Sequence, residues 1–116
     1  MLQSAFRMLW AVYALLLAIG SLQPARPGRL HSSAFHPLLH LVSFAVLYLL
    51  SRNAFPAWLW HTFAGCILFG LTLELLQSGL YHFTVEWADV ATDVVGVCVG
   101  SLVWVLFSMH KRRVRS

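Results

Sequence analysis

Four apolar runs, separated by short polar or proline-containing segments, dominate the pattern of the chain. They cover about residues 8–22, 33–50, 54–77 and 88–107. A helix needs about 20 predominantly apolar residues to cross the roughly 30 Å hydrocarbon core of a membrane. The pattern therefore predicts an all-α fold, a multi-pass transmembrane bundle of four helices that forms a single domain over residues 1–116.

The segments between the runs predict where the helices end. Residues 23–28 contain two prolines and a glycine, which cannot continue a helix. Pro37 and Pro56 are expected in the first turns of the second and third helices, where a missing N–H removes no hydrogen bond. Residues 51–53 are expected to form a tight polar break, and residues 110–116 a basic cytoplasmic tail.

The first run has a second interpretation. Arg7, a short apolar core and the small residues around Ala18 and Gly20 are typical of a secretory signal with a cleavage site. We favour a spanning helix, and both interpretations place residue 21 outside the cytoplasm.

Composition supports a surface that faces lipid. Of the 116 residues, 59% are hydrophobic and 10% are charged, against about 25% charged in globular chains. The mean hydropathy is +0.75. These values exclude intrinsic disorder and argue against a soluble enzyme. Cys66 and Cys98 lie inside apolar runs without metal-type spacing, so we expect both to be small buried hydrophobic residues.

The basic residues indicate topology, because they all lie between or beyond the apolar runs. No basic helix face is present, so we expect no nucleic acid partner. With four spans, Arg7, Arg52 and the four basic residues of 111–115 share one side, and Arg26 and Arg29 lie on the other. The positive-inside rule predicts a plasma (inner) membrane protein with both termini in the cytoplasm. The basic cluster also suits contact with anionic membrane lipids.

All four acidic residues fall in one window: Glu74, Glu86, Asp89 and Asp93. An ionisable group inside a membrane costs several kcal/mol unless it faces protein or water, so such groups are functional candidates. We expect Glu86 to be interfacial. Asp89 is explained equally well as a favourable negative charge at the start of the fourth helix.

Three helices are predicted to carry polar groups at the same shallow depth. At 1.5 Å per residue, Glu74 lies about 6 Å, Asp93 about 7 Å and His40 about 5–10 Å from the outer helix ends. Gln77 shares a side of the third helix with Glu74. We expect an outward-facing polar pocket that binds substrate through His40, Glu74, Gln77, Asp89 and Asp93.

Small residues are predicted to close the floor of this pocket. Gly70 lies one turn beneath Glu74. One face of the fourth helix carries a continuous stripe: Asp89, Asp93, Gly96 and Gly100. The Gly-x-x-x-Gly part of the stripe allows another helix to approach closely, so Gly70, Gly96 and Gly100 are helix-packing candidates.

These residues resemble the signature of the VanZ-like membrane proteins, which reads Glu-x-x-Gln, a loop, then Asp-x-x-x-Asn-x-x-Gly-x-x-x-Gly. The matching positions, within a resemblance over about residues 36–104, are Glu74, Gln77, Asp89, Gly96 and Gly100. His40 matches the histidine of an upstream Asp-Lys-x-x-His. The resemblance implies a cell-envelope protein and, by resemblance only, a link to glycopeptide (antibiotic) resistance.

The chain departs from the family pattern at three places. His36-Pro37 replaces Asp-Lys, Asp93 stands where the family usually has Asn, and Phe83 occupies about the place of a loop arginine. These departures remove the two basic groups of the family pattern, and they move one acidic group from position 36 to position 93.

Three functions remain open on the sequence. The favoured one is a non-enzymatic pocket for an envelope lipid headgroup, a cell-wall precursor or a partner helix, including that of a homo-oligomer. The second is an intramembrane hydrolase or transferase with Glu74 as base and His40 or Asp93 assisting. The third is a small proton-coupled transporter. No cofactor and no metal is expected, although His36, His40, Glu74 and Asp93 would offer mixed N/O ligands.

Overall fold

The all-α prediction is confirmed. A computed structural model describes residues 2–21, 35–57, 59–81 and 87–115, with side chains from Leu38 in the second helix and up to Leu80 in the third. These residues form four helices: α1 (Leu2–Ser21), α2 (Phe35–Ala54), α3 (Leu59–Tyr81) and α4 (Trp87–Arg115). The described part of the chain contains no strand.

Three helices, α1, α3 and α4, are each long and apolar enough to cross a membrane. The remaining helix, α2, is 20 residues long, and its apolar segment among the described side chains is Leu38–Ala54. The molecule is therefore compatible with a membrane location.

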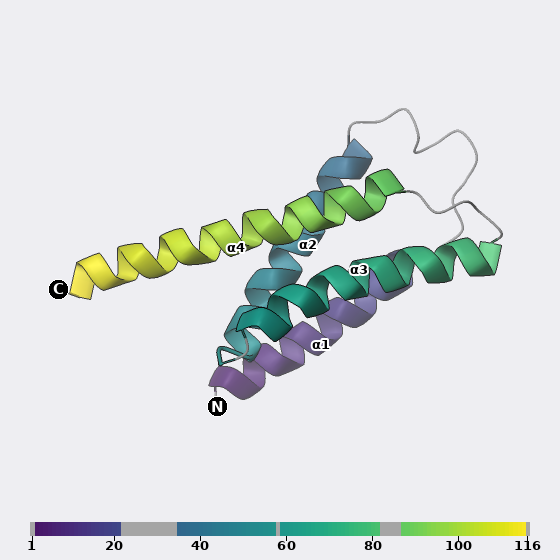
Figure 1. Cartoon of the computed structure of the whole chain (residues 1–116). Coiled ribbons are helices and arrows are strands. Elements are labelled where there is room, and N and C mark those ends of the chain that lie inside the picture. The colour runs from purple at the N-terminus through teal and green to yellow at the C-terminus, as the bar shows by residue number, and fades with distance from the viewer. Residues whose placement is uncertain (1, 22–34, 58, 82–86, 116) are drawn as a thin grey trace.

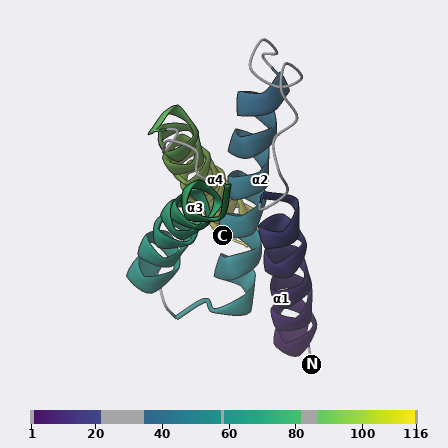
Figure 2. The ribbon, with the colours of Figure 1, turned by 90° about the vertical axis from the view of Figure 1, so that its right-hand side faces the viewer.

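Helix α2 lies at the centre of the molecule. Its most extensive contact is with α4, followed by that with α1, whereas α1 and α3 touch each other least. Consecutive helices run in opposite directions (Figure 1). Figure 2 shows α2 between α1 on one side and α3 and α4 on the other. The neighbouring helices therefore cover α2.

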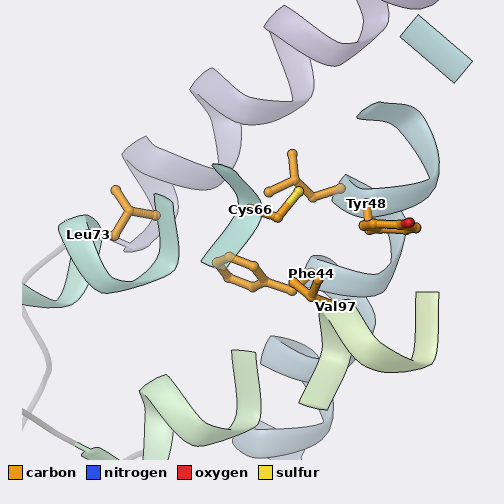
Figure 3. Packing of buried hydrophobic residues seen from close by; sticks show 6 residues of the cluster. Phe44, Tyr48, Cys66, Leu73 and Val97 are labelled. Atoms are coloured by element: carbon orange, nitrogen blue, oxygen red, sulfur yellow. The ribbon is translucent and has the colours of Figure 1, made fainter. Parts of the chain in front are cut away.

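The core forms where α2 meets α3 and α4. Its buried hydrophobic residues are Phe44, Leu47, Tyr48, Cys66, Leu73 and Val97. Figure 3 shows the labelled members of this cluster converging between the three helices. Burying side chains of this size contributes about 1.5–3 kcal/mol each, so the core fixes how the helices cross. Cys66 is buried as predicted, whereas Cys98 is exposed.

Four predicted helix ends, on α1, α3 and α4, are wrong by several residues. α1 begins at Leu2, so Arg7 lies inside it and donates through Nε to Ala54 O at the end of α2 (3.1 Å). α3 begins at Leu59 and continues to Tyr81. α4 runs to Arg115, because a helix that has left the apolar core can continue through basic residues, which favour its last turn.

The predicted polar break at residues 51–53 is also wrong, since these residues form the last turn of α2. Ser51 Oγ donates to Leu47 O (2.7 Å) and Asn53 Nδ2 to Leu49 O (2.8 Å). Their polar groups are thus satisfied on the helix itself. Pro56, which lacks an N–H, lies in the turn that follows α2 rather than in the first turn of α3.

Candidate functional site

A histidine and a carboxylate from two different helices form a direct contact. His40 Nδ1 on α2 lies 2.8 Å from Asp93 Oδ1 on α4. Asp93 is only 5% exposed, while His40 is half-buried. A buried carboxylate requires such a partner, because desolvation of an unpaired charge is costly. The structure therefore joins two of the predicted substrate-binding residues.

Two glycines of α4 set the distance across this contact. A Cβ added at Gly96 would lie 2.5 Å from Leu41 O, and one at Gly100 would lie 2.8 Å from Ala45 O. Both values are shorter than any ordinary van der Waals contact, and the opposing atoms are backbone. Only glycine permits this approach of α4 to α2. Asp93 lies on the same buried face of α4, which places its short side chain within reach of His40.

The third helix meets the same carboxylate at Gly70. A Cβ there would lie 3.1 Å from Asp93 Oδ2 and 3.0 Å from Phe44 Cε1. Asp93 therefore presents one oxygen to α2 and the other to α3. The absence of a side chain at Gly70 makes this possible, because any larger residue would compete with the carboxylate for the same space.

Glu74 lies one turn from Gly70 on α3 and is 7% exposed. Gly70 in turn faces Asp93, which contacts His40. We call His40, Glu74 and Asp93 the polar cluster. Two buried carboxylates and an imidazole in one region are uncommon in an apolar molecule, so this cluster is the candidate functional site.

The residues of the polar cluster lie at similar distances from the ends of their helices. From Phe35, Tyr81 and Trp87, a rise of 1.5 Å per residue puts His40, Glu74 and Asp93 about 7.5, 10 and 9 Å along their helices. Glu74 is deeper than the predicted 6 Å because α3 continues to Tyr81.

The other predicted residues lie around the polar cluster. Gln77 is half-buried, one turn after Glu74, and Asp89 is half-buried in the first turn of α4. Negative charge is favoured at that helix end, so Asp89 also has a structural reason to be there. Glu86 and the side chain of His36 lie outside the described residues.

No metal site is evident in the described part of the chain. Among the side chains that the structure describes (residues 2–21, 38–57, 59–80 and 87–115), no group of three or more His, Cys, Asp and Glu is arranged to hold an ion.

A second feature was not predicted from the sequence. A cavity of about 400 Å³ lies between α1, α2 and α3. Within it Trp10 Nε1 donates to Ser51 Oγ (2.9 Å), and Cys66 Sγ lies 3.7 Å from the same oxygen. The sequence did indicate that Ser51 faces the interior, because it follows Phe44 and Leu47 at helical spacing. The prediction of a loop at residues 51–53 prevented this interpretation.

The chain was also compared with known proteins. No protein-family model, no curated protein and no solved structure matches it. The VanZ-like resemblance therefore stays a prediction, and the geometry of the polar cluster is the remaining guide to function.

Proposed function

We propose that the chain is a multi-pass integral membrane protein of the cell envelope whose polar cluster binds the headgroup of an envelope lipid or of a lipid-linked cell-wall precursor. One observation carries the proposal: Asp93, buried on α4, contacts His40 on α2, and a second buried carboxylate, Glu74, lies on α3 one turn from Gly70, which faces Asp93. The VanZ-like resemblance of the same positions is consistent with it, as is a link to glycopeptide resistance by resemblance.

Helix packing alone does not explain these charges. The approach of α4 to α2 depends on Gly96 and Gly100, which need no carboxylate beside them. Apolar residues of similar volume often stabilise a buried position as well as an ion pair does. Charges retained at such a place are better explained by a ligand.

The charge of the polar cluster indicates the chemistry of that ligand. Carboxylate oxygens accept hydrogen bonds, and an ionised carboxylate attracts positive charge. A headgroup that presents donors, such as an ammonium group or sugar hydroxyls, is complementary to this surface.

The orientation that we propose places the polar cluster near the outer face of the plasma membrane. The alternating directions of α1 to α4 put both termini on one side if every helix crosses. That side carries six of the eight basic residues, so the positive-inside rule assigns it to the cytoplasm.

A second candidate, an intramembrane hydrolase or transferase, is favoured by the contact between His40 and Asp93. A carboxylate bonded to Nδ1 holds an imidazole in the tautomer and orientation that proton transfer needs. In this alternative, Glu74 or His40 serves as the base. Release of a chemically altered lipid by the purified protein would favour it over simple binding.

The test compares Glu74→Gln with wild type. The full chain is purified from cell membranes, and lipids that remain bound are identified by mass spectrometry. We expect Glu74→Gln to reduce the retained headgroup class by about tenfold, the equivalent of about 1.4 kcal/mol, with the same amount of protein in the membrane fraction. Glu86→Gln, which removes the same charge in the predicted loop, serves as the control.

Two outcomes would contradict the proposal. Loss of membrane insertion in Glu74→Gln would assign Glu74 a role in folding. An unchanged set of bound lipids in a normally inserted Glu74→Gln protein would remove the polar cluster as a binding site.

A further inference from the structure

The cavity between α1, α2 and α3 lies at the opposite end of the helices from the polar cluster. It is lined by the middle of α1, the last turns of α2 and the first half of α3. The lining residues that carry the argument are Trp10, Ala14, Ser51, Phe55, Gly65 and Cys66. Its volume of about 400 Å³ falls in the range of about 300–1,000 Å³ that is typical of small-ligand sites.

Small residues and a weak helix contact leave this space unfilled. α1 and α3 have the least contact of any touching pair of helices. A Cβ added at Gly65 would meet no atom within 4 Å, and Ala14 contributes only a methyl group from α1. The chain therefore has no side chain of its own to close the gap between these two helices.

The interior of the cavity suits hydrocarbon. Its walls are largely aromatic and aliphatic. The hydroxyl of Ser51 accepts from Trp10 Nε1 and donates to Leu47 O, so these polar groups are already satisfied by protein. A cavity of this kind offers water few hydrogen bonds and is better filled by an apolar group.

A cation lies at the edge of the cavity. The Arg7 guanidinium carbon is 5.1 Å from the centre of the Phe55 ring, which is part of the cavity wall. Arg7 Nε donates to Ala54 O, and the residue itself is exposed. The ring and the carbonyl hold the positive charge at the rim, where an anionic headgroup would lie if a lipid chain entered the cavity.

We propose that this cavity binds one acyl chain of an anionic phospholipid from the membrane leaflet on the N-terminal side of α1, with the lipid phosphate beside Arg7. The proposal needs α1 and α3 to lie in the bilayer and does not depend on what the polar cluster binds. Van der Waals contact of the chain with the cavity walls supplies most of the affinity, since a chain that leaves the bilayer gains nothing from removal from water, and Arg7 supplies the preference for an anionic headgroup.

The first test fills the cavity. The full chain, purified in detergent, is titrated with phosphatidylglycerol, and bound lipid is counted by native mass spectrometry. Gly65→Leu is expected to lower phosphatidylglycerol retention by about tenfold, which corresponds to about 1.4 kcal/mol. Gly79→Leu is the matched control: it makes the same change on the same helix, also with no atom within 4 Å, but outside the cavity. It should retain wild-type binding.

A second variant tests whether the loss in Gly65→Leu comes from filling the cavity or from a change in α3 itself. Ala14→Leu fills the cavity from α1 and should produce the same loss as Gly65→Leu. Wild-type retention of phosphatidylglycerol by both cavity-filling variants would overturn the proposal, as would an equal loss in Gly79→Leu.

The last test concerns the headgroup. Wild type should retain more phosphatidylglycerol than phosphatidylcholine, and Arg7→Gln should abolish that difference while phosphatidylcholine retention stays the same. Arg7→Lys, which keeps the charge, should preserve part of the preference. Equal retention of the two lipids by wild type would overturn the assignment of an anionic ligand.

Discussion

A single side chain, Asp93, connects three helices. One of its oxygens contacts His40 on α2, and the other faces the bare backbone of Gly70 on α3. Because asparagine has the same shape, its amide can still bond with the His40 ring. The shape and the charge of Asp93 can therefore be tested separately.

We expect Asp93→Asn to be mild and Asp93→Ala to be damaging. The alanine variant leaves His40 without its partner and creates a void, so the free energy of unfolding in detergent should fall by about 1–3 kcal/mol. The asparagine variant should lose less than about 1 kcal/mol. Denaturation followed by circular dichroism measures both, with Asp89→Asn as a half-buried control.

If Asp93→Asn proved as damaging as Asp93→Ala, the charge and not the shape would be required at this position. The family's usual asparagine would then not be equivalent to Asp93, and the VanZ-like resemblance would mislead at this residue.

At the scale of whole helices, α2 is the element on which the others assemble. It supplies three of the buried core residues, Phe44, Leu47 and Tyr48. It also contacts all three other helices. The two close contacts with α4, at Gly96 and Gly100, are the most sensitive part of this assembly.

Gly96→Ala should therefore separate α4 from α2. Its new Cβ would lie 2.5 Å from Leu41 O, and a backbone atom cannot move aside without moving its helix. We expect a loss of about 1–3 kcal/mol in the free energy of unfolding, the usual penalty of overpacking. Gly79→Ala, which meets nothing within 4 Å, should leave stability unchanged or slightly higher because alanine favours helix. Equal effects of the two changes would contradict the close approach.

The attachment of α1 to α2 is measurable through Trp10 and Ser51. Their hydrogen bond of 2.9 Å joins the two helices. Bonds of this type in membrane proteins contribute about 0.6 kcal/mol on average. A double-mutant cycle with Trp10→Phe and Ser51→Ala should yield a coupling energy of that size. Additive effects of the two substitutions would show that the bond contributes nothing to the attachment.

At the scale of the whole molecule, the two ends of the bundle differ in chemistry. The polar cluster with its two carboxylates lies toward one end, and Arg7 with the apolar cavity lies toward the other. The basic residues of 111–115, at the end of α4, belong to the Arg7 end when the helices alternate in direction. This asymmetry matches a membrane with an outer and a cytoplasmic face.

We expect both termini to lie in the cytoplasm. Reporter domains fused to each terminus should give cytoplasmic signals, and a cysteine at the exposed position Ala57 should react only from the cytoplasmic side once Cys66 and Cys98 are replaced. Termini on opposite sides would mean an odd number of crossings. In that case one of the four helices would not cross the membrane.

Much of this molecule follows from the sequence. The four apolar runs predicted four helices. The rise and period of a helix predicted that His40, Glu74 and Asp93 lie at similar distances from their helix ends, because both quantities are constant along any α-helix. The glycine stripe of α4 could be recognised for the same reason. These properties depend only on residues that are close in the sequence, so they can be recognised from the sequence alone.

Only the tertiary structure decided which helix is central, that residues 51–53 continue α2, and that a cavity separates α1 from α3. The periodicity of a helix shows which face is buried, but it does not identify the helix that packs against that face. Ser51 illustrates this: its neighbours in the sequence suggested a loop, whereas Trp10, 41 residues away, gives its hydroxyl a partner inside the bundle. Pairings of this kind depend on how the helices cross, and that depends on all their side chains together.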